Sequence, residues 1–172
     1  MKIEELVAAL GNNRSLFHFT DGRNLPSVSQ HGLLSLRELR RQGIKIEAPG
    51  GNDWSQDSAT RRGLDQYVNL GLRDRHPMEY VATKEGRVKD AKYLQVKLEV
   101  LMSPGIRFTA DVSNKAGVPL LTWEEAQNAF DWEILYTHTD WKDPAIQQRL
   151  RQASKYEVLV PDNVPIHLLK NI

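Results

Sequence analysis

Glu157 is the acidic residue whose setting best suits chemistry. It lies within the apolar segment 156–160, Tyr-Glu-Val-Leu-Val, which has the composition of a β-strand. Because side chains alternate along a strand, Glu157 shares its face with Leu159. That face is either solvated or part of a cleft. In a cleft, the carboxylate could stabilise a positive charge developing on a sugar, or it could act as a base.

His18 and Thr20 form a second polar pair, at alternate positions of a short strand predicted over residues 16–20. Both side chains then point to one face, while Phe17 and Phe19 point to the core. Since an imidazole and a hydroxyl can each donate and accept hydrogen bonds, the pair could hold a ribose or an amide. The alternative is a surface histidine beside a strand-end threonine.

Arg61 and Arg62 end a long segment without apolar periodicity, just before a strand predicted to begin at Tyr67. A guanidinium group in that position can form paired hydrogen bonds with a pyrophosphate or a carboxylate. Ordinary surface charge is the alternative for both arginines.

Several common catalytic patterns do not occur in the sequence. There is no glycine-rich phosphate loop, no GxSxG segment and no HExxH segment, and the five histidines lack the spacing of metal ligands. The chain has no cysteine, which excludes disulfides, zinc–thiolate sites and thiol nucleophiles. We therefore expect no bound metal.

The length of 172 residues fits a single domain, 1–172. The net charge of +1 does not by itself indicate a nucleic-acid partner, so such binding must come from local basic clusters such as Arg37, Arg40 and Arg41. No apolar segment approaches the roughly 20 residues that span a bilayer, and acidic residues interrupt the N-terminal segment. We expect a cytoplasmic protein that does not contact a membrane.

Helices and strands that position these side chains follow one another irregularly. Capping patterns place helix starts at Ser35, Thr122 and Asp143. The predicted helices cover residues 3–10, 22–31, 36–43, 78–85, 122–129 and 144–153; the predicted strands cover 16–20, 67–72, 93–100, 106–110, 156–160 and 166–169; a long loop covers 44–66. This order indicates an α+β fold with a largely antiparallel or mixed sheet.

Short motifs along the chain resemble those of one family, in the same order. The segment 16–20, Asn24-Leu25 and the segment 31–35 (His-Gly-Leu-Leu-Ser) resemble the N-terminal signature of the DarT family of DNA-base ADP-ribosyltransferases. Further matches follow at Arg61-Arg62 before Tyr67-Val68-Asn69-Leu70, at Arg75-His76-Pro77-Met78, at Thr109-Ala110-Asp111 with Asn114 and Ala116, at Asp131-Trp132 with Trp141, and at Arg151-Gln152-Ala153 with residues 157–161. Together they run from residue 16 to about residue 165.

The resemblance implies a split-sheet ADP-ribosyltransferase core with flanking helices and NAD in a cleft between two small sheets. It implies transfer of ADP-ribose from NAD, the co-substrate, to a thymine or guanine base of single-stranded DNA. It also implies a toxin of a toxin–antitoxin or anti-phage system, whose antitoxin partner has ADP-ribosyl hydrolase activity.

The resemblance also assigns roles to individual residues. Glu157 and Arg61 become catalytic, with Arg62 as the other register for the arginine. The predicted NAD-binding residues are His18, Thr20, Asn24, Leu33 and Tyr67. The predicted DNA-binding residues are Arg75, His138, Trp141 and Tyr156, most of them in a substrate-recognition loop over residues 136–156.

Two features depart from the family pattern. An extra Ser154-Lys155-Tyr156 separates Gln152-Ala153 from Glu157, and residues 69–72 lack the aromatics common in the family. Two alternatives stay open. The first is an NAD enzyme of the same fold that acts on RNA or protein, or that removes a terminal RNA phosphate. The second is a non-catalytic module that binds nucleic acid.

Overall fold

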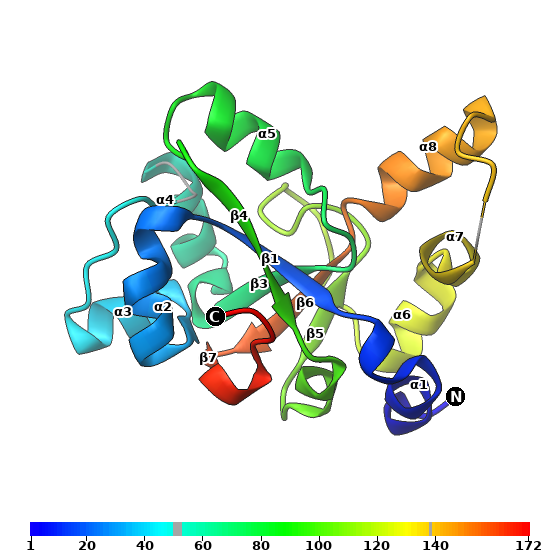
Figure 1. The fold of residues 1–172 in the computed structure, drawn as a ribbon, viewed down its shortest axis with the longest axis horizontal. Coiled ribbons are helices and arrows are strands. Elements are labelled where there is room, and N and C mark those ends of the chain that lie inside the picture. Colours follow the sequence, from blue (N-terminus) through cyan, green and yellow to red (C-terminus); the bar gives the residue numbers. More distant parts are fainter. Residues whose placement is uncertain (50–52, 138) are drawn as a thin grey trace.

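The centre of the molecule is an antiparallel sheet of five strands. The computed structural model describes residues 1–49, 53–137 and 139–172. The strands of this sheet are β1 Leu16–Asp21, β3 Tyr67–Gly71, β4 Ala91–Val96, β5 Arg107–Thr109 and β6 Glu157–Pro161, in the spatial order β4-β1-β3-β6-β5 (Figure 1). A second, two-stranded sheet pairs β2 Leu33–Leu34 with β7 Asn163–Val164. The expected α+β class is confirmed.

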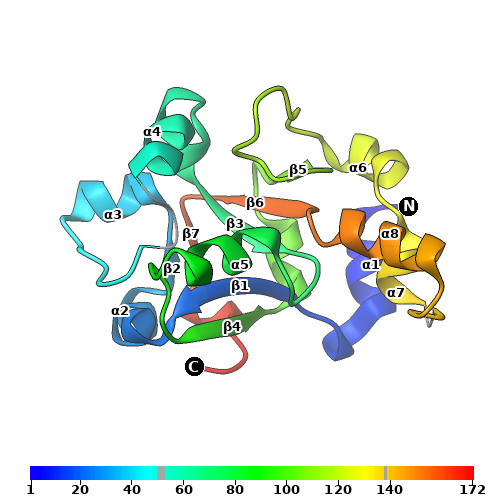
Figure 2. The ribbon, with the colours of Figure 1, turned by 90° about the horizontal axis from the view of Figure 1, so that it is seen from above.

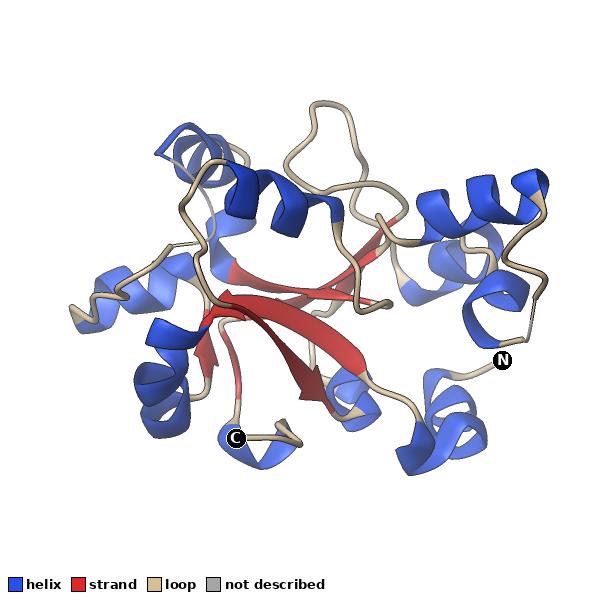
Figure 3. Ribbon diagram, turned by 45° about the horizontal axis from the view of Figure 1, so that its top comes forward, coloured by secondary structure: helices blue, strands red, loops and turns tan. Residues whose placement is uncertain are grey.

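The five-stranded sheet is split between β1 and β3. These strands share the single residue pair Phe17↔Gly71, whereas β1 pairs with β4 along its whole length and β3 pairs with β6 from Tyr67 to Gly71. The two halves therefore diverge beyond that pair, as the strands in Figure 3 show. Side chains of β1 and β3 face the space between the halves, so an unpaired stretch of sheet becomes the wall of a site.

Helices lie at both ends of the sheet. The described α-helices are α1 Ile3–Leu10, α2 Leu25–His31, α3 Leu36–Gln42, α4 Asp53–Arg61, α5 Pro77–Lys84, α6 Trp123–Ala129, α7 Trp132–Tyr136 and α8 Pro144–Ala153. Helices α2, α3 and α4 gather at one end, and α1, α6, α7 and α8 at the other (Figure 2). None of these described helices is long and apolar enough to cross a membrane.

The predicted helix starts are confirmed by their caps. The hydroxyl of Ser35 accepts a hydrogen bond from the backbone of Glu38, and Thr122 and Glu125 form a reciprocal capping box. The Asp143 carboxylate accepts from the backbone N–H of Ala145. Each cap satisfies a backbone donor that the first helical turn leaves free.

The element predictions fail in four places. The loop predicted over 44–66 contains α4 and a 3₁₀ turn at Leu64–Gln66, because α4 is polar and shows no apolar stripe. The strand predicted over 93–100 ends at Val96, and a 3₁₀ helix, Leu98–Met102, follows with its apolar residues still buried. The last predicted strand is the 3₁₀ turn Ile166–Leu168, preceded by the short β7. Helix α7 was not predicted.

Strand β6 is buried on both faces. Val158 and Leu159 are 0% exposed, although they point to opposite sides, and Glu157 is only 4% exposed. The solvated face considered for this carboxylate is therefore excluded. Strand β6 lies between β3 and β5 and is covered on both faces, so Glu157 lies inside the molecule. A charged side chain there requires hydrogen-bond or ionic partners.

Candidate active site

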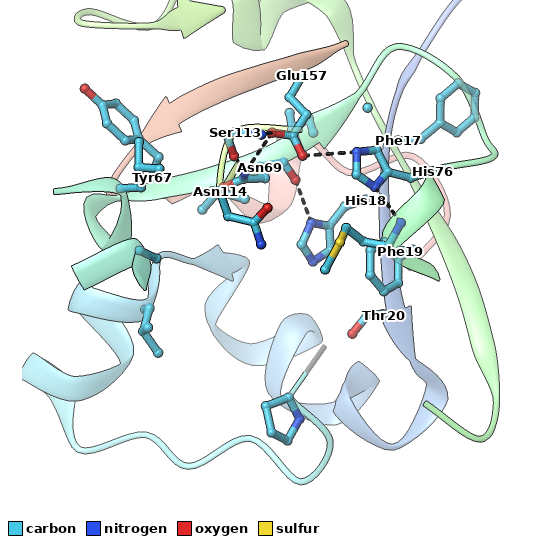
Figure 4. A pocket seen from close by; sticks show the side chains of 18 of the residues that line it. Phe17, His18, Phe19, Thr20, Tyr67, Asn69, His76, Ser113, Asn114 and Glu157 are labelled. Carbon is cyan, nitrogen blue, oxygen red and sulfur yellow. Dashed lines mark hydrogen bonds and ion pairs between the residues drawn. The ribbon is translucent and has the colours of Figure 1, made fainter. Parts of the chain in front are cut away.

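A cavity of about 570 Å³ opens where the two halves of the sheet part, and we call it the main cavity. Its size suits a small organic ligand or a nucleotide. Glu157, Ser113 and His76 lie at one end, His18 lies in the middle and Thr20 at the other end (Figure 4). The residues that line it and carry the argument below are His18, Thr20, Asn24, Leu34, Tyr67, Asn69, Arg73, His76, Met78, Ser113 and Glu157.

The Glu157 carboxylate faces nitrogen donors with both of its oxygens. Oε2 accepts hydrogen bonds from the backbone N–H of Ser113 at 2.8 Å and from the side-chain amide of Asn69 at 3.2 Å. Oε1 lies 3.0 Å from Nε2 of His76. The amide of Asn69 also donates to the hydroxyl of Ser113, at 2.7 Å. These contacts compensate a buried carboxylate for lost water and fix the direction in which Oε1 points.

His18 presents an acceptor to the main cavity. Its Nδ1 lies 3.0 Å from the backbone oxygen of Asn69. Because a carbonyl oxygen can only accept, Nδ1 carries the proton and Nε2 is left with a free lone pair. Burial lowers the pKa of His18, which favours the neutral ring. A neutral imidazole with an open Nε2 can accept a hydrogen bond from a sugar hydroxyl or an amide.

Thr20 and Asn24 both line the main cavity, but the Asn24 amide is already occupied. It donates to the backbone oxygen of Ala48 at 2.7 Å and to the hydroxyl of Thr20 at 3.1 Å, and its oxygen accepts from the N–H of Ala48. Asn24 therefore holds the chain around residue 48 against α2. The proton of the Thr20 hydroxyl is left to donate to a ligand.

Four further expectations about this part of the site need comment. Leu33 is 4% exposed, pairs with Val164 and belongs to the core, and the next residue, Leu34, lines the main cavity instead. Tyr67 lines the cavity from the start of β3, as expected for an NAD-binding residue. Phe17 and Phe19 are half-buried and also line the cavity, so the expectation that they face only the core is wrong.

Arg61 and Arg62 have different surroundings. Arg61 ends α4, is exposed and does not line the main cavity. The Arg62 guanidinium donates to the backbone oxygens of Ser113, Lys115 and Val118. It therefore holds the loop 113–118, whose first N–H binds Glu157. Of the two registers left open by the sequence, Arg62 is the one connected to the carboxylate.

One of the predicted DNA-binding residues, Tyr156, is not placed to bind DNA. Tyr156 is 4% exposed, stacks on Phe130 with ring centroids 4.4 Å apart and accepts a hydrogen bond from the N–H of Asp131. It is a core residue, and the expectation that it stacks on a base is wrong. Arg75 is exposed but lines neither of the two cavities. His138 lies outside the described residues. Residues 144–153 of the recognition loop expected over 136–156 form helix α8.

Trp141 lies at a second cavity, of about 400 Å³, between α7, α8 and the end of β3. Its side chain is 64% exposed. Phe17 and Arg73 line both cavities, so the two adjoin. Burial lowers the pKa of Arg73, and its guanidinium makes no hydrogen bond or ion pair within the described chain. Asp74 is the acidic group near it and also lines the second cavity. A partly desolvated guanidinium that forms no ion pair suits a phosphate group.

Four residues of the site were not singled out from the sequence as site residues: Asn69, Arg73, His76 and Ser113. His76 belongs to the segment that supports the family resemblance, but its contact with Glu157 depends on how β6 and the start of α5 meet. Among the described residues, no group of side chains could hold a metal ion.

The fold of this chain is similar to that of solved DarT and DarTG structures. DarTG of Thermosipho africanus in complex with ADP-ribose has a TM-score of 0.68 and 21% identity, covering 91% of this chain and 43% of that one. DarT of Thermus sp. 2.9 in complex with ADP-ribosylated ssDNA has a TM-score of 0.67 and 20% identity, covering 92% of this chain and 80% of that one. The same Thermus protein in complex with NAD+ has a TM-score of 0.59 and 20% identity, covering 93% of this chain and 81% of that one.

The chain belongs to the DarT family. The family model described as DarT, ssDNA thymidine ADP-ribosyltransferase, matches residues 17–172. A curated relative, the DNA ADP-ribosyl transferase–DNA ADP-ribosyl glycohydrolase fusion protein of T. africanus (strain H17ap60334), is 30% identical over 102 residues, which are 56% of this chain and 26% of that protein. The chain thus spans about a quarter of the length of this relative. The resemblance inferred from the sequence is confirmed.

Acidification is expected to destabilise the wild type more than His18→Gln. Since burial lowers the pKa of His18 below its ordinary 6.5, the unfolded chain binds this proton more readily. The contribution of the neutral, buried His18 to the free energy of unfolding is complete above pH 6.5 and is lost as the pH falls below that value. Each unit of lowering is worth about 1.4 kcal/mol. Urea unfolding at about pH 7.5 and about pH 5 measures the difference. The exposed His167→Gln is the control, and equal pH dependence in all three proteins would contradict the expectation.

Arg62→Ala is expected to loosen the loop 113–118, whereas Arg61→Ala is not. The first variant leaves three backbone oxygens without their donor and should lower the free energy of unfolding by about 1–3 kcal/mol. Hydrogen–deuterium exchange measures the effect directly, because the Ser113 amide should exchange faster once its loop is free. Unchanged exchange in Arg62→Ala would show that other contacts hold the loop.

Proposed function

We propose that this chain transfers the ADP-ribose of NAD to the thymine base of single-stranded DNA, with Glu157 as the catalytic carboxylate. The observation that carries the proposal is the buried Glu157, which accepts two hydrogen bonds and lies 3.0 Å from Nε2 of His76, at the point where the sheet opens into a nucleotide-sized cavity. Membership of a family described as ssDNA thymidine ADP-ribosyltransferase supports the donor, the acceptor and the reaction.

The reaction breaks the bond between nicotinamide and ribose and forms a bond between the ribose carbon and a base nitrogen. Positive charge grows on the ribose as nicotinamide leaves with the bonding electrons, and a carboxylate beside the ring stabilises that charge. In thymidine one ring nitrogen carries a proton, and this proton must leave as the new bond forms. Oε1 of Glu157 has one donor near it, against two at Oε2, so Oε1 is the oxygen left to accept the proton.

The remaining polar groups of the main cavity suit NAD. The open Nε2 of His18 accepts from a hydroxyl or an amide, and the Thr20 hydroxyl donates. Arg73 lies where the two cavities meet and forms no ion pair with its neighbour Asp74, so it suits a phosphate of NAD or of DNA. The complex of Thermus DarT with NAD+ supports NAD as co-substrate for this fold.

The second cavity suits the DNA strand. It adjoins the main cavity, it is lined by Arg14 and Arg73, and Trp141 presents an exposed ring at its edge. Cationic groups beside an exposed aromatic ring are the usual means of holding single-stranded nucleic acid, through phosphate contacts and base stacking. A single strand also spares the enzyme the cost of pulling a base out of a duplex.

In the cell, the proposed role is the toxin of a toxin–antitoxin pair in the cytoplasm, where DNA and NAD are both present. The relative from T. africanus supports this role, since its description joins a DNA ADP-ribosyl transferase to a DNA ADP-ribosyl glycohydrolase. An antitoxin that removes ADP-ribose from DNA would be the matching partner.

Wild-type protein with NAD is expected to add one ADP-ribose to a thymidine-containing single-stranded oligonucleotide. Glu157→Gln should lower the rate by about 10²–10⁴-fold, because the amide can neither take the proton nor offset the positive charge. Intact-mass spectrometry of the oligonucleotide measures the adduct, and fragmentation locates it. The exposed Glu124→Gln is the control and should behave as wild type.

Acceptors without thymidine, RNA and protein belong in the same experiment. Transfer to RNA or protein but not to DNA would refute the proposed acceptor. DNA binding without any consumption of NAD would favour a non-catalytic module.

Trp141→Ala is expected to raise the KM for DNA by about 5- to 100-fold and to leave the KM for NAD unchanged, since stacking on an aromatic ring contributes roughly 1–3 kcal/mol per base. Steady-state kinetics with each substrate varied in turn measure both constants. Tyr80→Ala is a matched control, because Tyr80 is 67% exposed, has a lysine over its ring as Trp141 does, and lines neither cavity. An equal rise in both variants would argue against the second cavity as the DNA path.

A further inference from the structure

His76 is a buried side chain that the proposed chemistry does not yet use. It is 8% exposed and precedes Pro77 at the start of α5, with its ring directed into the main cavity (Figure 4). Its Nε2 lies 3.0 Å from Oε1 of Glu157 and has no other polar partner in the described chain. The contact has the distance of a hydrogen bond but does not meet its geometry, so Nε2 makes no hydrogen bond in this structure. Such contacts often tighten when substrate binds.

The proton on the His76 ring can be placed from its neighbours. The backbone N–H of Met78 donates to Nδ1 at 3.3 Å, which makes His76 the N-terminal cap of α5. A nitrogen that accepts a hydrogen bond carries no proton in the neutral ring, so the proton is on Nε2. The helix start thereby selects the tautomer that points an N–H at Glu157.

The ring is held on several sides. It stacks on Phe19 with centroids 6.4 Å apart and ring planes 16° from parallel. The backbone N–H of His76 donates to the Tyr93 hydroxyl, which in turn donates to Glu79. Burial raises the pKa of Tyr93 to about 12, so this phenol stays neutral. The titratable or charged groups around the ring are therefore Glu157 in direct contact, Tyr93 and Glu79 behind the backbone, and His18 and Arg73 in the cavity.

We propose that His76 is the positioning residue of the catalytic carboxylate: its helix-selected Nε2–H donates to Oε1 of Glu157 and aims that oxygen at the reacting ribose and base. The inference rests on the proposed function, since it names a residue that acts through Glu157. Ser113 and Asn69 fix Oε2, and His76 is the residue that fixes the other oxygen. A carboxylate held on one oxygen alone could turn about its last bond, and small errors of aim lower catalytic rates steeply.

Two substitutions separate this role from that of a helix cap. His76→Asn keeps a side-chain oxygen that can cap α5, but its amide is too short to reach Oε1. His76→Gln places an amide donor near the position of Nε2 and gives up the capping acceptor. If His76 positions Glu157, kcat should fall about 10- to 100-fold in His76→Asn, as is usual when a supporting hydrogen bond to a charged group is lost. In His76→Gln, kcat should be largely restored. The KM for NAD should stay unchanged, because the lost interaction orients a reacting group.

If His76→Gln were less active than His76→Asn, His76 would serve only as the N-terminal cap of α5, and the proposal would be overturned. Equal loss in both variants with unchanged thermal midpoints would also overturn it. So would full activity of His76→Asn.

Nuclear magnetic resonance of the ¹⁵N-labelled histidine rings tests the geometry without any reaction, so the proposal can be judged even if no transfer to DNA is found. The spectrum should show the Nε2–H tautomer for His76, assigned by its absence in His76→Gln. Its Nε2 proton resonance should move in Glu157→Gln. An Nδ1–H tautomer, or a resonance that ignores the loss of Glu157, would refute the contact.

Discussion

The single residue pair between β1 and β3 is the constraint on which the site depends. Two adjacent strands that hydrogen-bond along their length leave no room between them. Here Phe17 and Gly71 meet and the strands then part. The divergence exposes the polar face of β1, with His18 and Thr20, to a cavity that the second half of the sheet closes with Glu157. The interaction between His18 and the backbone oxygen of Asn69 spans the opening and limits how far the halves separate.

Burial of Glu157 explains the arrangement of its neighbours. A carboxylate on a strand that is covered on both faces has no water to stabilise it, so nitrogen donors must do so. The nitrogen atoms that face it come from three parts of the chain: a strand residue, Asn69; a loop backbone at Ser113; and a helix start at His76. The loop in turn is held by Arg62. The charge is thus stabilised by parts of the chain that the fold brings together.

The sequence predicted those features that a local pattern determines. Glu157 stands out because an acidic residue interrupts an apolar strand, and His18 and Thr20 share a face because strands alternate. Contacts between distant segments have no local pattern. Nothing near Tyr156 shows that it stacks on Phe130 while Trp141 stays exposed, and nothing near His76 shows that β6 passes beside it. Helix α4 was missed because it lacks an apolar stripe. The strand prediction ran on to Val100 because the 3₁₀ helix after β4 buries Leu98 and Val100, the same side chains that a longer strand would bury.

Phe17 and Arg73 line both cavities, and this shared wall limits how the protein can diverge. Under the proposed function, a change at either residue alters both the pocket proposed for the donor nucleotide and the path proposed for the acceptor strand. Selection for a new acceptor would there be opposed by selection to keep the donor. The residues Ile134, Leu135, Thr137, Thr139, Trp141 and Leu150 line the second cavity and not the main cavity. Under the same proposal, acceptor preference is free to change on that side, while the strands that line the proposed donor pocket stay fixed.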